Sequence, residues 1–125
     1  NFRLDYKVIP DAILHLEKNG HKYRLALELE LTRKNNQRLV EKIKQYEASN
    51  YYNYILYIFP TSSLKEKYME VIAEKLGADA LKRIMFFCHE NISSEADNFE
   101  AIHGVFNGKN VQFKDVFLAN RTGVE

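Results

Sequence analysis

The sequence has little cysteine, no long apolar run and almost no excess of charge of one sign. Its single cysteine, Cys88, excludes an internal disulfide and fits a reducing compartment, so we expect a cytoplasmic protein. No apolar run approaches the roughly 20 residues of a membrane span, and the N-terminus has no signal-peptide pattern. We therefore expect no membrane partner. The formal net charge of +1 argues neither for nor against nucleic acid, since only local clustering of charge could do so.

What the sequence does contain is enough for one ordinary domain. It has 125 residues, of which 46% are hydrophobic and 28% are charged, a balance that can build a core in a soluble protein. We expect a single domain over residues 1–125. The chain begins at Asn1 rather than at a methionine, inside an expected strand, and we expect it to be a fragment of a longer chain.

Alternating and apolar segments predict a mixed sheet. Two expected strands, 11–17 and 22–31, flank Asn19-Gly20, the strongest short signal for a β-hairpin. A β-hairpin-rich start followed by the order α-β-α-β indicates an α/β (α+β mixed-sheet) fold, with helices packed on a central mixed sheet. The other expected strands are 2–8, 51–59, 83–88 and 111–117.

Two helices are expected to connect these strands. The first covers roughly residues 37–49, and the second ends before Gly77. A helical turn is expected near 95–103. The nearly all-apolar strand 51–59 is expected to be covered on both faces. The expected caps are Asn35 or Asn36 for the first helix and Ser62 or Ser63 for the second.

A two-residue turn at Asn19-Gly20 decides which residues face each other across the hairpin. Glu17 then lies opposite Lys22, an opposite-charge pair that supports this register, and Asp11 lies opposite Glu28. Side chains alternate along a strand, so one face is apolar and the other is charged. The expected core face holds Ala12, Leu14, Leu16, Tyr23, Leu25, Leu27, Leu29 and Leu31. The charged face holds Asp11, His15, Glu17, Lys22, Arg24, Glu28 and Glu30.

The charged face gathers three carboxylates. Opposite Cβ atoms in a hairpin lie about 4.5–5.5 Å apart, and like charges there destabilise the pair. A hard cation such as Mg²⁺ or Mn²⁺ would relieve the repulsion, because it favours carboxylate and water oxygens. Two alternatives stay open: a slip of the register would remove the pairing, or the face is an ordinary solvated one neutralised by Arg24, Arg33 or Lys34. The three carboxylates are Asp11, Glu28 and Glu30.

The first expected helix brings a lysine toward these acids. Lys42 and Tyr46 lie four residues apart on one helix face, with Arg38 one turn earlier. Lys42 borders the apolar stripe, so its stem can lie along the sheet while its ammonium reaches the strand-end carboxylates. Lys44, on the other border, is the alternative, and a surface helix with solvated lysines is the plainer interpretation. The stripe consists of Leu39, Val40, Ile43 and Tyr46.

Basic residues cluster near the end of the second hairpin strand and the start of this helix. Lysine and arginine at such a place can contact the phosphates of DNA. An ordinary charged helix face explains the same cluster equally well. The set consists of Arg33, Lys34, Arg38, Lys42 and Lys44.

Taken together, these residues resemble the PD-(D/E)XK nuclease superfamily, and more narrowly the replication-relaxation group and the related MobC-type plasmid relaxases. Pro10-Asp11 matches the PD element, and Glu28-Leu29-Glu30 matches the (D/E)xK element with glutamate in the lysine position. The segment from Lys42 to Tyr46 matches the helix motif. The resemblance covers about residues 3–59. The helix that usually precedes the first strand and the winged-helix-like DNA-binding segment are not visible.

The resemblance implies a restriction-endonuclease-like core and a metal-dependent endodeoxyribonuclease that nicks DNA in plasmid mobilisation or replication. Asp11 and Glu28 would hold Mg²⁺ or Mn²⁺. Glu30 would be a ligand through water or a base, and Lys42 would act on the nucleophile, which is either water or a tyrosine. The implied partners are plasmid DNA and other mobilisation or replication proteins. From the clustering of basic residues, the candidates for contacting that DNA are Arg33, Lys34, Arg38 and Lys44.

Two further interpretations belong to other classes of protein. A nuclease fold without activity could serve as a DNA-binding or protein-docking module. A weaker alternative is a dimerisation module that uses the tyrosine-rich strand 51–59.

Overall fold

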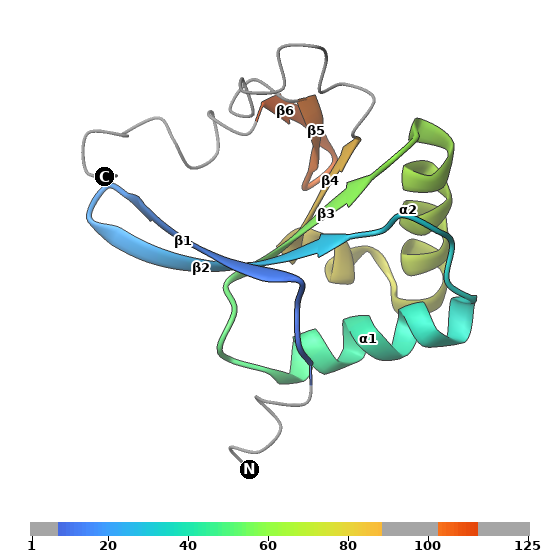
Figure 1. Cartoon of the computed structure of the whole chain (residues 1–125), viewed down its shortest axis with the longest axis horizontal. Coiled ribbons are helices and arrows are strands. Elements are labelled where there is room, and N and C mark those ends of the chain that lie inside the picture. The colour runs from blue at the N-terminus through green and yellow to red at the C-terminus, as the bar shows by residue number, and fades with distance from the viewer. Residues whose placement is uncertain (1–7, 89–102, 113–125) are drawn as a thin grey trace.

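A computed structural model describes residues 8–88 and 103–112 and shows one six-stranded sheet with two α-helices (Figure 1). The strands occur in the sheet in the same order as in the chain. No helix in the described ranges is long and apolar enough to cross a membrane. In chain order the elements are β1 (Ala12–Lys18), β2 (His21–Leu29), α1 (Asn36–Ala48), β3 (Tyr54–Phe59), α2 (Ser62–Leu76), a 3₁₀ helix (Ala78–Arg83), β4 (Ile84–Cys88), β5 (His103–Phe106) and β6 (Lys109–Gln112).

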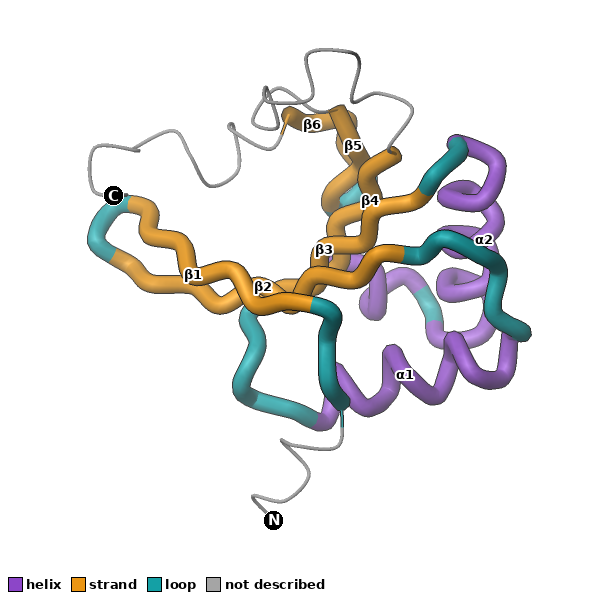
Figure 2. Tube along the Cα trace, in the orientation of Figure 1, coloured by secondary structure: helices purple, strands orange, loops and turns teal. Residues whose placement is uncertain are grey.

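The sheet is mixed, as the sequence predicts. Strands β2, β3 and β4 run parallel, while β1 pairs with β2 and β5 pairs with both β4 and β6 in antiparallel fashion. Both helices lie on the same face of the sheet (Figure 2). Parallel neighbours need a crossover connection, and here α1 and α2 provide it. The hairpin followed by α-β-α-β is therefore confirmed.

The hairpin of β1 and β2 has the predicted register. Asn19 and Gly20 both have positive φ, at 54° and 82°, as a type I′ turn requires. Glu17 pairs with Lys22 and Lys18 pairs with His21. The two-residue turn therefore sets which side of β2 each glutamate occupies.

Side-chain caps set where the helices begin. Asn35 caps α1 by accepting a hydrogen bond from Arg38 N at 2.8 Å. Thr61, rather than Ser62 or Ser63, caps α2, because its hydroxyl accepts from Leu64 N at 3.2 Å. Gly77, with φ of 90°, ends α2 as expected.

Two apolar clusters cover the two faces of the sheet. The helix-side cluster joins the buried residues of α1 and α2 to the sheet, while no helix residue belongs to the second cluster. Residues 55–59 of β3 are buried, so this strand is covered on both faces as predicted. Because β3 also lies between β2 and β4, it offers no free edge that could pair with a second chain. The helix-side cluster includes Ala26, Leu39, Ile43, Tyr46, Tyr57, Tyr68 and Phe86; the second includes Leu25, Leu27, Leu56, Met85 and Phe87.

The expectation for the two faces of β2 needs correction. Leu29 and Leu31 are not in the core, since 47% and 74% of their surface is exposed. The glutamates instead lie on the helix side, where Glu28 and Glu30 are only 1% and 3% exposed. The helices therefore bury the charged face at the end of β2, and the apolar face opens to solvent there.

Several expected boundaries also differ from the structure. The strand expected from residue 51 begins at Tyr54, and β5 was not expected at all. The strand expected over 111–117 corresponds to β6 where it is described, and β6 begins two residues earlier. The strand at 2–8 and the turn near 95–103 lie outside the described residues, except for Val8, which is not in a strand, and His103, which begins β5.

Candidate active site

The candidate site lies at the edge of the sheet where β2 ends and β1 begins. Because β2, β3 and β4 are parallel, their carboxyl ends meet at this edge, and β1 starts beside it. This is where open α/β sheets commonly place their ligands. The structure gathers Asp11, Glu28, Glu30 and Lys42 in this region.

Glu28 is held by two residues of α1. Lys42 Nζ lies 2.9 Å from one carboxylate oxygen, and the Tyr46 hydroxyl donates a short hydrogen bond to the other. Burial raises the pKa of Glu28 above its ordinary value of 4.5, although the hydrogen bonds from Tyr46 and Lys42 act in the opposite direction. Lys42 therefore reaches the strand-end carboxylate as its position on the helix predicts.

The same contacts determine the chemistry of Tyr46. Its ring is fully buried where α1 packs on the sheet. Burial and the adjacent Glu28 carboxylate raise the pKa of the Tyr46 hydroxyl. Tyr46 therefore keeps its proton and serves as a donor to Glu28.

Glu30 is held in a closed ring of hydrogen bonds. Lys34 Nζ contacts both of its carboxylate oxygens, at 2.7 and 3.1 Å. The Tyr68 hydroxyl of α2 donates to Glu30 at 2.7 Å and accepts from Lys34 N at 3.0 Å. This ring joins the end of β2, the loop before α1 and helix α2. Lys34 thus neutralises Glu30, as one of the open alternatives expected, but the carboxylate is buried rather than on a solvated face.

Asp11, directly before β1, completes the acidic group. Its side-chain Oδ2 accepts a hydrogen bond from Leu29 N at 2.8 Å, and its own N donates to Leu27 O at 2.9 Å. The carboxylate is thereby fixed beside the peptide that links Glu28 to Leu29. The charge of Asp11 also raises the pKa of Glu28, although burial raises it more.

Tyr57 is a member of this region that the sequence analysis did not identify. It pairs with Glu28 in the register of β2 and β3 and is fully buried. Its hydroxyl has no hydrogen-bond partner among the described residues. Burial raises its pKa, and the charges of Glu28 and Glu30 raise it further. Tyr57 and Tyr68 lacked any sequence signal, because tyrosine in an apolar segment usually serves as core filling.

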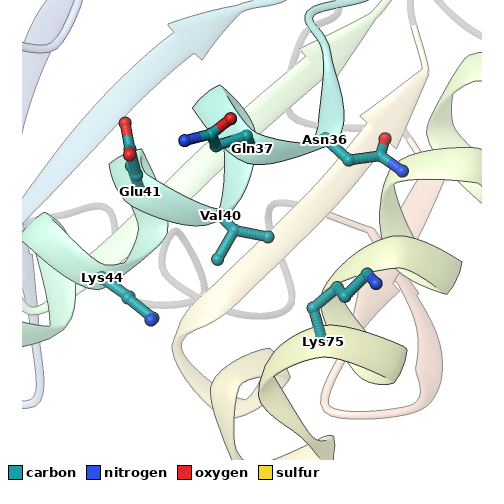
Figure 3. Close-up of a pocket in the computed structure, with 6 residues that line it drawn as sticks. All are labelled: Asn36, Gln37, Val40, Glu41, Lys44 and Lys75. Carbon is teal, nitrogen blue, oxygen red and sulfur yellow. The ribbon is translucent and has the colours of Figure 1, made fainter.

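The expected basic rim divides into separate groups. Lys34 and Lys42 are engaged with the acids, and Arg33 donates to Asn36 Oδ1 at 2.7 Å. Arg38 is exposed. Lys44 points instead into a groove of about 400 Å³ between α1 and α2, which Lys75 lines from α2 (Figure 3). The groove is completed by Asn36, Gln37, Val40 and Glu41.

The donor set can be compared with the needs of a hard cation. Within the described parts of the chain, no three His, Cys, Asp or Glu side chains are arranged as a metal-binding group. Asp11 is exposed at this edge, whereas Glu28 is buried and each of its oxygens already accepts a hydrogen bond. A cation at Glu28 would take the place of the Lys42 ammonium, whose side chain is partly exposed. The donors thus suit Mg²⁺ or Mn²⁺ in kind, once Lys42 is displaced.

Comparison of the chain with models of protein families, with curated proteins and with solved structures gives no match.

Proposed function

We propose that this edge of the sheet is the active site of a metal-dependent DNA endonuclease. The observation that supports it is that Lys42 Nζ of α1 lies 2.9 Å from Glu28 of β2, while Asp11, directly before β1, accepts a hydrogen bond from Leu29 N, next to Glu28. Carboxylates that bind a hard cation, beside a lysine that can stabilise a developing negative charge, are the groups that phosphodiester cleavage needs. A restriction-endonuclease-like core agrees with the order of the elements.

The residues take distinct roles in this proposal. Asp11 and Glu28 hold Mg²⁺ or Mn²⁺, which supplies Lewis-acid activation of the phosphate and of a water molecule. Lys42 leaves Glu28 and contacts the attacked phosphate. Glu30 acts through water, because Lys34 and Tyr68 already engage its two oxygens. Water is the favoured nucleophile, since Tyr46 is buried and keeps its proton.

The biological setting follows from the resemblance to plasmid relaxases. In that setting the chain nicks DNA during plasmid mobilisation or replication and acts with other proteins of those systems. Arg38, exposed one helical turn before Lys42, is the best-placed of the expected phosphate contacts.

Calorimetric titration with Mn²⁺ tests the cation site directly. We expect the wild-type chain and the exposed-site control Glu47→Gln to bind Mn²⁺, and we expect Glu28→Gln to lose binding. Nicking of supercoiled plasmid in Mn²⁺ should then fall by roughly 10²-fold or more in Lys42→Met. A wild-type chain that binds no Mn²⁺ at millimolar concentration would overturn the proposal.

One observation favours a second candidate, a nuclease fold that binds DNA or protein without cleaving. Each buried glutamate already has a lysine and a tyrosine as partners, so both charges are satisfied without a cation. This candidate predicts salt-dependent DNA binding that Mn²⁺ and Glu28→Gln leave unchanged. The Mn²⁺ titration and the measurement of DNA binding against salt concentration together distinguish the two candidates.

A further inference from the structure

The Tyr57 hydroxyl is a buried polar group in an otherwise well-satisfied region. Tyr57 stands beside Glu28 across the β2–β3 ladder, and its ring packs beside those of Phe59 and Phe86, with centroid separations of 5.6 and 6.4 Å. Tyr68 meets it edge-on at 6.1 Å. These contacts fix the ring, so the hydroxyl cannot turn to solvent to find a partner. A buried hydroxyl with no partner is uncommon in native proteins and calls for an explanation.

The carboxylates around Tyr57 have unused capacity to accept hydrogen bonds. Each carboxylate oxygen can accept about two. Both oxygens of Glu28 accept one each, from Lys42 and Tyr46. One oxygen of Glu30 accepts only from Lys34. Three acceptor positions therefore remain on the two side chains whose charges act on Tyr57.

The charge balance selects the kind of ligand that fits these groups. Glu28 is neutralised by Lys42 and Glu30 by Lys34, so the polar groups near Tyr57 need no additional ion. They need a neutral molecule that accepts one hydrogen bond and donates two. Water meets this requirement, and a buried water typically makes about three hydrogen bonds.

We propose that one buried water molecule accepts a hydrogen bond from Tyr57 and donates to Glu28 and Glu30. The water links β3 to Glu28 of β2 and to Glu30, directly after β2, and holds both carboxylates in fixed orientations. Tyr57 is thus a positioning residue for Glu28. This inference does not depend on nuclease activity, because the same water would order the acids in an inactive protein.

The sign of the stability change in Tyr57→Phe tests the proposal. Removing a hydroxyl that has a bound partner destabilises a protein, whereas removing an orphaned buried hydroxyl is neutral or stabilising. We expect the urea midpoint of Tyr57→Phe to fall. Tyr68→Phe, which loses a hydrogen bond that the structure shows, should also lower the midpoint, and Tyr51→Phe, with an exposed side chain, should leave it unchanged. A midpoint that stays or rises in Tyr57→Phe would overturn the proposal.

A crystal structure of the wild-type chain distinguishes a bound water from a direct contact. We expect an electron-density peak about 2.7–3.0 Å from the Tyr57 hydroxyl oxygen and within hydrogen-bonding reach of Glu28, and its loss in Tyr57→Phe. A Tyr57 hydroxyl bonded directly to a glutamate, with no peak between them, would contradict the proposal even if stability falls.

Discussion

At the scale of single residues, Glu28 combines burial with charge. Its side chain is removed from water but retains two hydrogen-bond donors, and burial is the larger influence, so its pKa is raised in the folded chain. Between its ordinary value of 4.5 and the raised value, the folded protein binds more protons at Glu28 than the unfolded chain does. Glu28 therefore contributes less stability as pH rises through this window.

Glu28→Gln should remove this pH dependence. We expect the free energy of unfolding of the wild-type chain to fall relative to Glu28→Gln as pH rises above about 4.5, and to level off above the raised pKa. Each unit of raised pKa corresponds to about 1.4 kcal/mol. Urea unfolding of both proteins at several pH values measures the difference, and Glu47→Gln on the exposed side of α1 should show no such trend. A difference that grows with pH would mean that Lys42 and Tyr46 outweigh burial.

Tyr68 joins Glu30 to helix α2 through a hydrogen bond. Tyr68→Phe keeps the ring in the core and removes the hydroxyl that joins Glu30 to Lys34 N. We expect it to reduce the free energy of unfolding by about 1.5–3 kcal/mol, the usual range for a hydrogen bond to a charged group. Denaturant unfolding measures this loss. An unchanged stability would show that Lys34 alone satisfies Glu30.

The sequence indicated part of this site because its signals were local. The hairpin turn and the alternation of side chains put Asp11, Glu28 and Glu30 on one face, and helical spacing put Lys42 within reach. Tyr57 and Tyr68 were not predicted, because their roles depend on how β3 and α2 pack against β2. The burial of Glu28 and Glu30 was missed for the same reason, since no pattern within β2 shows that helices cover its charged face.

At the scale of elements, the hairpins β1–β2 and β5–β6 share the same turn sequence, Asn-Gly. Asn19-Gly20 predicted β1 and β2 with the correct register. Asn107-Gly108 is the same dipeptide, and both of its residues have positive φ, 56° and 77°, in the turn between β5 and β6. Those strands have only four residues each, too few for clear alternation. The Asn-Gly turn is therefore the one local signal for this hairpin, and without strand patterns beside it the hairpin was not predicted.

Gly104 is a position where β5 packs tightly on β4. A Cβ atom added there would lie 2.5 Å from Cδ1 of Phe87 and 2.7 Å from the carbonyl oxygen of Phe86. Because Gly104 pairs with Phe87 in the ladder, Gly104→Ala must displace the strand or a core ring. We expect a loss of about 1–3 kcal/mol in the free energy of unfolding, measured with urea. Asn110→Ala on exposed β6 serves as the control, and equal stability of the two variants would contradict the tight packing.

At the scale of the whole molecule, α1 separates two differently charged regions. One side of the helix carries Lys42 and Tyr46 to the buried acid of β2. The other side faces α2 across the groove that Lys44 and Lys75 line. The basic cluster that looked continuous in the sequence is therefore divided by the helix, because residues two apart on a helix point in nearly opposite directions.

The separation of the basic residues by α1 predicts which of them contacts DNA. If DNA lies across the candidate active site, Arg38, one turn before Lys42, contacts phosphate, whereas Lys44 in the groove does not. Each phosphate contact contributes about 0.9 to the slope of log affinity against log salt concentration for duplex DNA. We expect Arg38→Ala to reduce the slope by about that amount and Lys44→Ala to leave it unchanged, as measured by fluorescence anisotropy over a salt series. A reduction confined to Lys44→Ala would place DNA over the groove between the helices, away from Glu28, and would separate DNA binding from the proposed catalytic site.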